Sequence, residues 1–235
     1  MNHDWPSGSL LGRLRDATRQ ELLSLGTPVR YAPDSEMVRQ GAKDNHALLL
    51  LRGAAKVRTI DEAGATALLS IKTGGDFVGE MAALDGNPRS ATVIACGEIT
   101  AKFITRPTLM AFLARRSDAF VELINVGSAH LRWANERRRE LPQPSTTRIA
   151  RVLVDLVQAH GRRALGGWVL GFPLTKVELA SIAGMKPRTA EKSFSDLRNA
   201  GVVVTGLRRD VFVPDLERLR EFSAVQVGLP PRRHL

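Results

Sequence analysis

The sequence has 235 residues, of which 43% are hydrophobic and 25% are charged. This composition is ordinary for a folded globular protein and argues against a largely disordered chain. The formal net charge of +10 is unevenly placed, with 19 basic and 16 acidic side chains over residues 1–142 but 15 and 8 over residues 143–235. A basic domain suits a polyanion, because binding to phosphates releases condensed counterions.

The rarer residue types exclude several classes of protein. The single cysteine, Cys96, cannot form a disulfide framework or ligate a cluster within one chain. No stretch reaches the roughly 18 apolar residues of a membrane span, and the first residues lack the apolar run of a signal peptide. The five histidines are scattered, without the spacing of a zinc site. We therefore expect a cytoplasmic protein that is not an enzyme, has no membrane contact and holds no metal, haem or iron–sulfur cluster.

The first half of the chain changes from a helical to a strand pattern. Residues 9–24 carry leucines near helical spacing and predict one amphipathic helix. From residue 26 to residue 105, short runs rich in Val, Ile and Leu are broken by turns that contain Gly or Asp, which is typical of an all-β roll or barrel. The main predicted strands cover residues 47–51, 55–60, 67–72, 91–95 and 100–104.

Helical spacing returns after Pro107. We predict a short helix over 107–116 and a long helix from 117 or 118 to about 140. Two small residues in its apolar stripe permit close approach of a second helix. The prolines at 142 and 144 end the helix, so we place the domain boundary between residues 142 and 143. The stripe consists of Phe120, Leu123, Ile124, Gly127, Leu131 and Ala134.

The last third of the chain predicts a small helical domain with a hairpin. A helix over 147–160 is followed by a connection, a strand over 168–172 and two helices that meet at a tight turn. A hairpin over 201–214, a short helix over 215–222 and a flexible tail over 226–235 complete the chain.

The two central helices of this domain carry clear start and turn signals. Thr175 and Glu178 form a capping box at the start of the first helix. Gly184 offers the positive φ angle that the turn requires, and Pro187 opens the second helix where a missing N–H costs nothing. The buried stripe of the second helix is expected to be Ala190, Phe194 and Leu197.

The opposite face of the second helix is basic and is expected to be exposed. Arg and Lys donate hydrogen bonds to guanine O6 and N7, and Thr contacts a thymine methyl group or a phosphate. The pair of helices and the hairpin therefore predict a winged helix-turn-helix that binds double-stranded DNA, with a basic hairpin tip on backbone phosphates. The expected DNA-binding residues are Thr175, Lys176, Lys186, Arg188, Thr189, Lys192, Ser193 and Arg208.

A second motif, GGDFVGEMAALDGNPRSATV, spans residues 74–93. A short helical turn begins at Gly79 and Glu80, and Arg89 and Ser90 follow after a second turn. Amides at a helix N-terminus, a guanidinium and a hydroxyl together form an anion site. Because an ionised carboxylate only accepts hydrogen bonds, the natural partner of Glu80 beside this anion is a ribose hydroxyl.

The segment is similar to the phosphate-binding cassette of the cyclic-AMP receptor protein and fumarate-nitrate reductase regulator superfamily of bacterial transcription regulators. The resemblance spans nearly the whole chain and implies an α+β protein with a cyclic-nucleotide-binding β-roll (1–116), a dimerisation helix and hinge (117–142) and a winged helix-turn-helix (143–225). It implies that Glu80 binds the ribose, and that Arg89 and Ser90 bind the cyclic phosphate. The expected nucleotide-binding residues are Gly79, Glu80, Met81, Ala82, Arg89, Ser90, Ala134 and Asn135.

The sequence departs from the family pattern at two functional places. The Thr-Ser pair that contacts the base in the family corresponds here to Ala134 and Asn135, of which only Asn135 can pair with a purine edge. Cyclic AMP is the first expected effector and cyclic GMP the second. The recognition helix of well-known relatives opens with Arg-Glu, whereas here it opens with Pro187 and Arg188, so their operator sequence is not assumed.

The resemblance also predicts how the protein works. A homodimer binds a pseudo-palindromic operator, with half-sites about 34 Å apart. The ligand shifts the population of two states as the DNA-binding domains swing about residues 141–145. RNA polymerase is a further expected partner. The alternative is a DNA-binding regulator of the same fold whose β-roll binds no ligand or answers to an effector other than a nucleotide.

Overall fold

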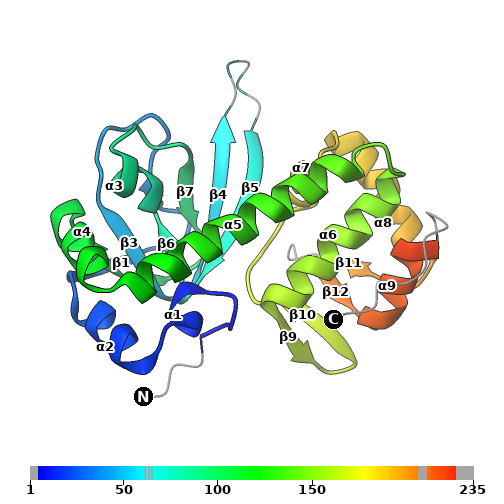
Figure 1. Ribbon diagram of the computed structural model, residues 1–235. Helices are drawn as coiled ribbons and strands as arrows, with labels where there is room; N and C mark the ends of the chain where they lie inside the picture. Colours follow the sequence, from blue (N-terminus) through cyan, green and yellow to red (C-terminus); the bar gives the residue numbers. More distant parts are fainter. Residues whose placement is uncertain (1–4, 61, 63, 65, 206–210, 226–235) are drawn as a thin grey trace. The chain divides into compact units, whose positions relative to one another are not determined.

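The computed structural model describes residues 5–60, 62, 64, 66–205 and 211–225. The chain divides into two compact units between Arg132 and Trp133. The N-terminal unit contains two antiparallel sheets with helices, and the C-terminal unit contains a small sheet with helices (Figure 1). The predicted α+β class, with a β-roll, a long helix and a winged helix-turn-helix in that order, is confirmed.

Two four-stranded sheets form the β-roll, in the orders β1-β8-β3-β6 and β2-β7-β4-β5. Strand β3 is buried on both faces: Leu49 joins the core beneath the helices, and Leu48 and Leu50 join the core between the sheets. This split follows from the two-residue period of a strand. The five predicted strands correspond to β3, β4, β5, β7 and β8. The strands are β1 Thr27–Tyr31, β2 Glu36–Val38, β3 Ala47–Arg52, β4 Ala54–Ile60, β5 Thr66–Thr73, β6 Phe77–Val78, β7 Thr92–Ala95 and β8 Ile99–Ile104.

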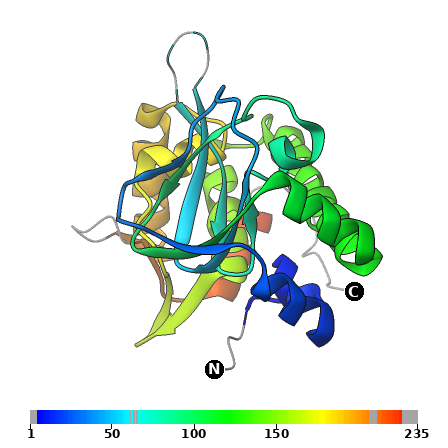
Figure 2. The same ribbon diagram turned by 90° about the vertical axis from the view of Figure 1, so that its left-hand side faces the viewer.

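The helices of the N-terminal unit gather on one side of the strands (Figure 2). The single helix predicted over 9–24 is wrong, because the chain is extended at Leu14 and Arg15. The Arg19 guanidinium donates hydrogen bonds to the carbonyl oxygens of Leu11 and Leu14, and so satisfies the acceptors at the end of the first helix. The helices are α1 Leu10–Arg13, α2 Asp16–Ser24, α3 Glu80–Asp85 and α4 Arg106–Arg115.

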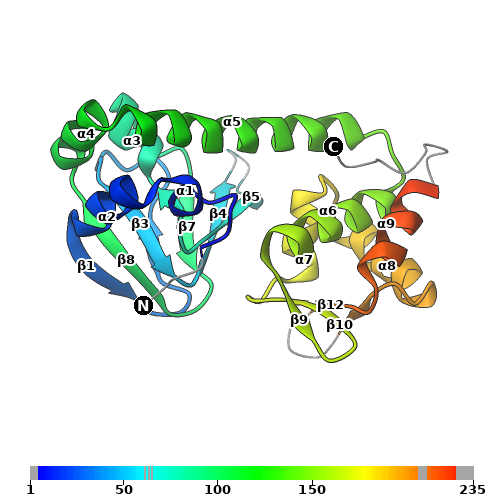
Figure 3. The ribbon, with the colours of Figure 1, turned by 60° about the horizontal axis from the view of Figure 1, so that its bottom comes forward.

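The long helix α5 (Ser117–Glu140) is continuous and has the predicted bounds (Figure 3). Its apolar residues divide into two faces rather than one stripe. Leu123 and Val126 are buried against the core of the N-terminal unit. Phe120, Ile124 and Leu131 are exposed by 44%, 50% and 63%, which leaves an apolar face of α5 uncovered in the single chain.

The C-terminal unit packs its helices with a sheet of order β11-β12-β10-β9. The connection predicted over 161–167 contains a strand, β9, whose side chains are mostly exposed and give no apolar alternation. The guanidinium of Arg163 on β9 lies 4.2 Å from the ring of Trp168 on β10, and this contact supports the pairing. The elements are α6 Ser145–His160, β9 Gly161–Ala164, β10 Gly167–Leu170, α7 Lys176–Ile182, α8 Pro187–Asn199, β11 Val204–Thr205, β12 Val211–Val213 and α9 Leu216–Val225.

Candidate functional site

A cavity of about 70 Å³ lies in the N-terminal unit, at the start of α3. Gly79 precedes this helix with a φ angle of +75°. A Cβ atom there would clash with Nη1 of Arg89, and the positive φ angle also favours glycine at this position. Six of the residues predicted to bind a nucleotide line this cavity, namely Gly79, Glu80, Met81, Ala82, Arg89 and Ser90.

Ala134 and Asn135, the two residues predicted to contact the base, do not line this cavity. Ala134 and Asn135 are exposed residues of α5 and belong to the C-terminal unit. The rest of the cavity wall is mainly apolar and comes from Val38, Val57, Val78, Ala91 and Val93.

Arg89 anchors the floor of the cavity, with a side chain only 1% exposed. Its guanidinium donates hydrogen bonds of 2.7 Å to the carbonyl oxygens of Gly79 and His46 and to the carboxylate of Asp44. The hydrogen bond from Arg89 lowers the pKa of Asp44. Burial lowers the pKa of His46, and the charge of Arg89 lowers it further. Asp44 thus forms an ion pair with Arg89 within the protein.

Lys72 is a cavity residue that sequence reasoning missed. It lies at the end of β5 and is only 6% exposed. Its Nζ atom lies 3.3 Å from Nδ1 of His130 on α5 and 3.9 Å from Oε1 of Glu80. Burial raises the pKa of nearby Asp76, and the charge of Lys72 opposes this shift. A charged residue at the end of the apolar run 67–72 was the one sequence signal for it.

In the C-terminal unit, α7 and α8 form the predicted helix-turn-helix. Thr175 and Glu178 make the predicted capping box, and Gly184 has a φ angle of +63° in the turn. Arg148 of α6 donates hydrogen bonds of 2.9 Å to the carbonyl oxygens of Ala183 and Gly184. These bonds fix the turn to α6.

The face of α8 opposite the core carries the cations expected there. Lys186, Arg188, Thr189 and Lys192 are exposed. The Nζ atom of Lys176 on α7 lies 3.1 Å from the carboxylate of Glu191, an exposed residue of α8 that was not singled out in the sequence.

One of the predicted DNA-binding residues differs from expectation. Ser193 was predicted on the exposed face, which is wrong because it is fully buried. Its hydroxyl donates to the carbonyl oxygen of Thr189 and makes a hydrogen bond with the hydroxyl of Ser145, so it belongs to the packing of α8 on α6. Arg208 lies outside the described residues.

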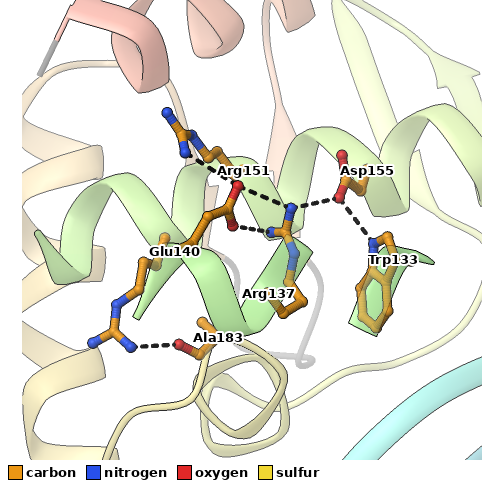
Figure 4. Close-up of polar contacts among 7 residues, drawn as sticks. Trp133, Arg137, Glu140, Arg151, Asp155 and Ala183 are labelled. Atoms are coloured by element: carbon orange, nitrogen blue, oxygen red, sulfur yellow. Dashed lines mark hydrogen bonds and ion pairs between the residues drawn. The ribbon is translucent and has the colours of Figure 1, made fainter. Parts of the chain in front are cut away.

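A network of ion pairs joins the end of α5 to α6 (Figure 4). Glu140, whose side chain is 9% exposed, lies 3.0 Å from Arg137 and 3.1 Å from Arg151. Arg137 also contacts Asp155 at 3.1 Å, and the indole N–H of Trp133 donates to the same carboxylate at 2.9 Å. The last two turns of α5 are therefore part of the C-terminal unit, and the linker over 141–145, predicted as the hinge, lies inside that unit.

Comparison with known proteins agrees with this geometry. Residues 28–116 match the cyclic nucleotide-binding domain, and residues 147–222 match the Crp-like helix-turn-helix domain. The chain belongs to the cyclic-AMP receptor protein and fumarate-nitrate reductase regulator superfamily. It is therefore a member of a family of DNA-binding transcription regulators.

Individual relatives cover most of the chain. A CRP-like cAMP-activated global transcriptional regulator of Mycobacterium tuberculosis is 25% identical over 194 residues, which cover 82% of this chain and 86% of the relative. The solved structure of the regulator CLP from Xanthomonas campestris has a TM-score of 0.72 at 18% identity and covers 86% of this chain and all of that one. FixK2 from Bradyrhizobium japonicum has a TM-score of 0.71 at 16% identity, with coverages of 84% and 96%. The two structures show the shared fold.

Within the described residues, no helix is both long and apolar enough to cross a membrane. No group of three or more metal-ligating side chains occurs in the same part of the chain.

Proposed function

We propose that the protein is a transcription regulator that binds a cyclic nucleotide, with cyclic AMP favoured over cyclic GMP, and acts on a pseudo-palindromic operator as a homodimer. The observation that carries this proposal is the convergence of Glu80, Arg89 and Ser90 on one cavity. The name of the M. tuberculosis relative, a cAMP-activated regulator, supports cyclic AMP. The X. campestris regulator is described as c-di-GMP responsive, so effectors differ among proteins of this fold.

The chemistry of the cavity fits a ribose cyclic phosphate. Arg89 donates charge-assisted hydrogen bonds to the phosphate, with the hydroxyl of Ser90 beside it, and Glu80 accepts a hydrogen bond from the ribose. The cavity of about 70 Å³ is smaller than the ~300–1,000 Å³ of ligand pockets in general. Binding therefore widens the pocket, and the phosphate competes with Asp44 for Arg89.

A second copy of the chain is the proposed partner of the exposed face of α5. Phe120, Ile124 and Leu131 recur along this face at helical spacing, and the small residue Gly127 lies between them. A helix with the same face opposite would bury these side chains from water. The ion-paired end of α5 contributes to α6 rather than to this interface.

Two copies present two α8 helices to DNA. Arg188 and Lys192 are placed to read base edges in the major groove, and half-sites are expected about 34 Å apart. In this role the protein works in the cytoplasm, with RNA polymerase as a further partner at the promoter. We place the pivot for the DNA-binding unit upstream of Trp133, because the contacts of Glu140 bind the end of α5 to α6.

The effector is tested by titrating the purified full-length protein with cyclic AMP and cyclic GMP in a calorimeter. Arg89→Ala should weaken nucleotide binding by about tenfold to a hundredfold. The substitution removes hydrogen bonds from a charged group to the phosphate, and such bonds contribute about 1.5–3 kcal/mol. Arg39→Ala is the matched control, since Arg39 is a surface arginine of the same unit whose side chain is 75% exposed.

Two results would contradict the effector. Absence of both binding heat and thermal shift at millimolar nucleotide would leave the alternative, a DNA-binding regulator whose β-roll binds no nucleotide. Equal nucleotide affinity in Arg89→Ala and in the wild type would show that the cavity is not the binding site.

A further inference from the structure

Lys72 brings an unexpected charge to the wall of the proposed effector pocket. It lies on β5, is 6% exposed, and lines the same cavity as Glu80, Arg89 and Ser90. A buried ammonium is costly unless its donors are paired. Lys72 therefore needs hydrogen-bond acceptors or negative charges around it.

One acceptor for the ammonium of Lys72 is the side chain of His130. Since an ammonium only donates, Nδ1 of His130 is the acceptor of the 3.3 Å hydrogen bond, and the proton of the imidazole lies on Nε2. Asp76 lies close enough for the charge of Lys72 to oppose the rise that burial causes in the pKa of this carboxyl group. An ammonium has three donors, so Lys72 has further capacity toward the cavity.

The distance between Lys72 and Glu80 is suited to one intervening group. Nζ and Oε1 are 3.9 Å apart, which is within ion-pair range but longer than a hydrogen bond. A hydroxyl has one donor and two acceptor sites. A hydroxyl oxygen at an ordinary distance of about 2.8 Å from both atoms can therefore donate to the carboxylate and accept from the ammonium.

We propose that Lys72 is a specificity-determining residue that donates a hydrogen bond to the ribose 2′-hydroxyl, the same hydroxyl that donates to Glu80. This inference rests on the proposed function, because it takes the effector to be a 3′,5′-cyclic ribonucleotide. The pair then selects ribose over deoxyribose, since a ligand without the hydroxyl leaves the buried ammonium of Lys72 and the partly exposed carboxylate of Glu80 without their shared partner. His130 positions the ammonium from α5.

The test compares cyclic AMP with 2′-deoxy cyclic AMP by calorimetry on the full-length protein. We expect the wild type to prefer cyclic AMP by roughly a hundredfold. Lys72→Met should bind cyclic AMP about tenfold more weakly and leave the affinity for the deoxy analogue within about twofold, so that the preference falls about tenfold. Lys43→Met, at an exposed position of the same unit, should keep the preference of the wild type.

Other outcomes separate this inference from the proposed function. A Lys72→Met variant that binds both ligands equally more weakly would overturn the inference, because Lys72 would then contact the phosphate or support the fold. If Lys72→Met does not fold, Lys72→Arg retains a cationic donor and should keep the wild-type preference within about threefold. Loss of the preference in a folded Lys72→Arg variant would overturn the inference, as would a wild type that binds both ligands equally. A wild type that binds neither nucleotide would overturn the proposed effector, and the inference with it.

Discussion

Buried charges are arranged differently in the two units of the protein. In the N-terminal unit, Lys72 and Arg89 border a cavity, and Lys72 stays 3.9 Å from the carboxylate of Glu80. In the C-terminal unit, Glu140 contacts two arginines directly, and the network continues to α6. A lysine held apart from a carboxylate beside a cavity has hydrogen-bonding capacity for a ligand, whereas ion pairs in direct contact hold one helix against another. The same residue types therefore indicate binding in one unit and mechanical connection in the other.

The largest expected effect tests the ion pairs of Glu140 in the C-terminal unit. Glu140→Ala leaves Arg137 and Arg151 without their shared carboxylate, so we expect a loss of about 3–5 kcal/mol in the free energy of unfolding. Urea denaturation followed by circular dichroism measures this loss. Glu217→Ala, which removes an exposed ion pair with Arg220 in the same unit, should cost less than about 1 kcal/mol. Equal, small losses in both variants would show that the network does not stabilise the unit.

A second effect compares the response of the units to acid. Burial lowers the pKa of His160 in the C-terminal unit from 6.5 to about 4. Above pH 6.5 the folded and unfolded states are both neutral at this residue. As the pH falls from 6.5 toward 4 the unfolded state binds the proton first, so stability is lost, by about 3 kcal/mol at pH 4.

The carboxylate of Asp44 in the N-terminal unit behaves differently. Its pKa is lowered, so its contribution is present above its ordinary pKa of 3.8 and is lost only as the pH falls below that value. Thermal melts between pH 7 and pH 4.5 should show a falling melting temperature that His160→Phe reduces in slope. An unchanged slope in a folded His160→Phe variant would assign the acid sensitivity to another group.

The smallest effect concerns the exposed cations of α8. After an operator has been selected from random DNA, Arg188→Ala and Lys192→Ala should each reduce the preference for it by about 1–3 kcal/mol per lost base contact. Arg39→Ala, which removes the same charge from the N-terminal unit, should leave the preference unchanged. Variants that weaken binding to all sequences equally would place these side chains on phosphates rather than on bases.

Local signals made much of the fold predictable from the sequence. The capping box at Thr175, the turn at Gly184 and the start of α8 at Pro187 depend on neighbouring residues, and each was found in advance. The cassette residues from Gly79 to Ser90 lie close in the chain, and they meet at one cavity.

The missed features depend on residues far apart in the chain. Lys72 contacts His130, and Arg137 contacts Asp155. The partners are too far apart in the sequence for the hydrophobic period of a helix or strand to predict these contacts. The exposure of Ser193 was predicted wrongly because a serine in a polar helix resembles a solvent-facing residue, yet its hydroxyl makes hydrogen bonds with Thr189 and Ser145. Polar residues are difficult to place from a sequence when tertiary partners satisfy them.

Because ion pairs attach the last turns of α5 to α6, the number of residues in α5 determines the direction in which that attached end faces. Each residue of an α-helix advances the chain by 1.5 Å and turns it by about 100°. One residue inserted before Trp133 would therefore turn the bound end of α5 by about 100° against its buried residues Leu123 and Val126. Four inserted residues would nearly restore the original orientation and lengthen the helix by about 6 Å. The number of residues between these two attachments thus sets a phase as well as a length.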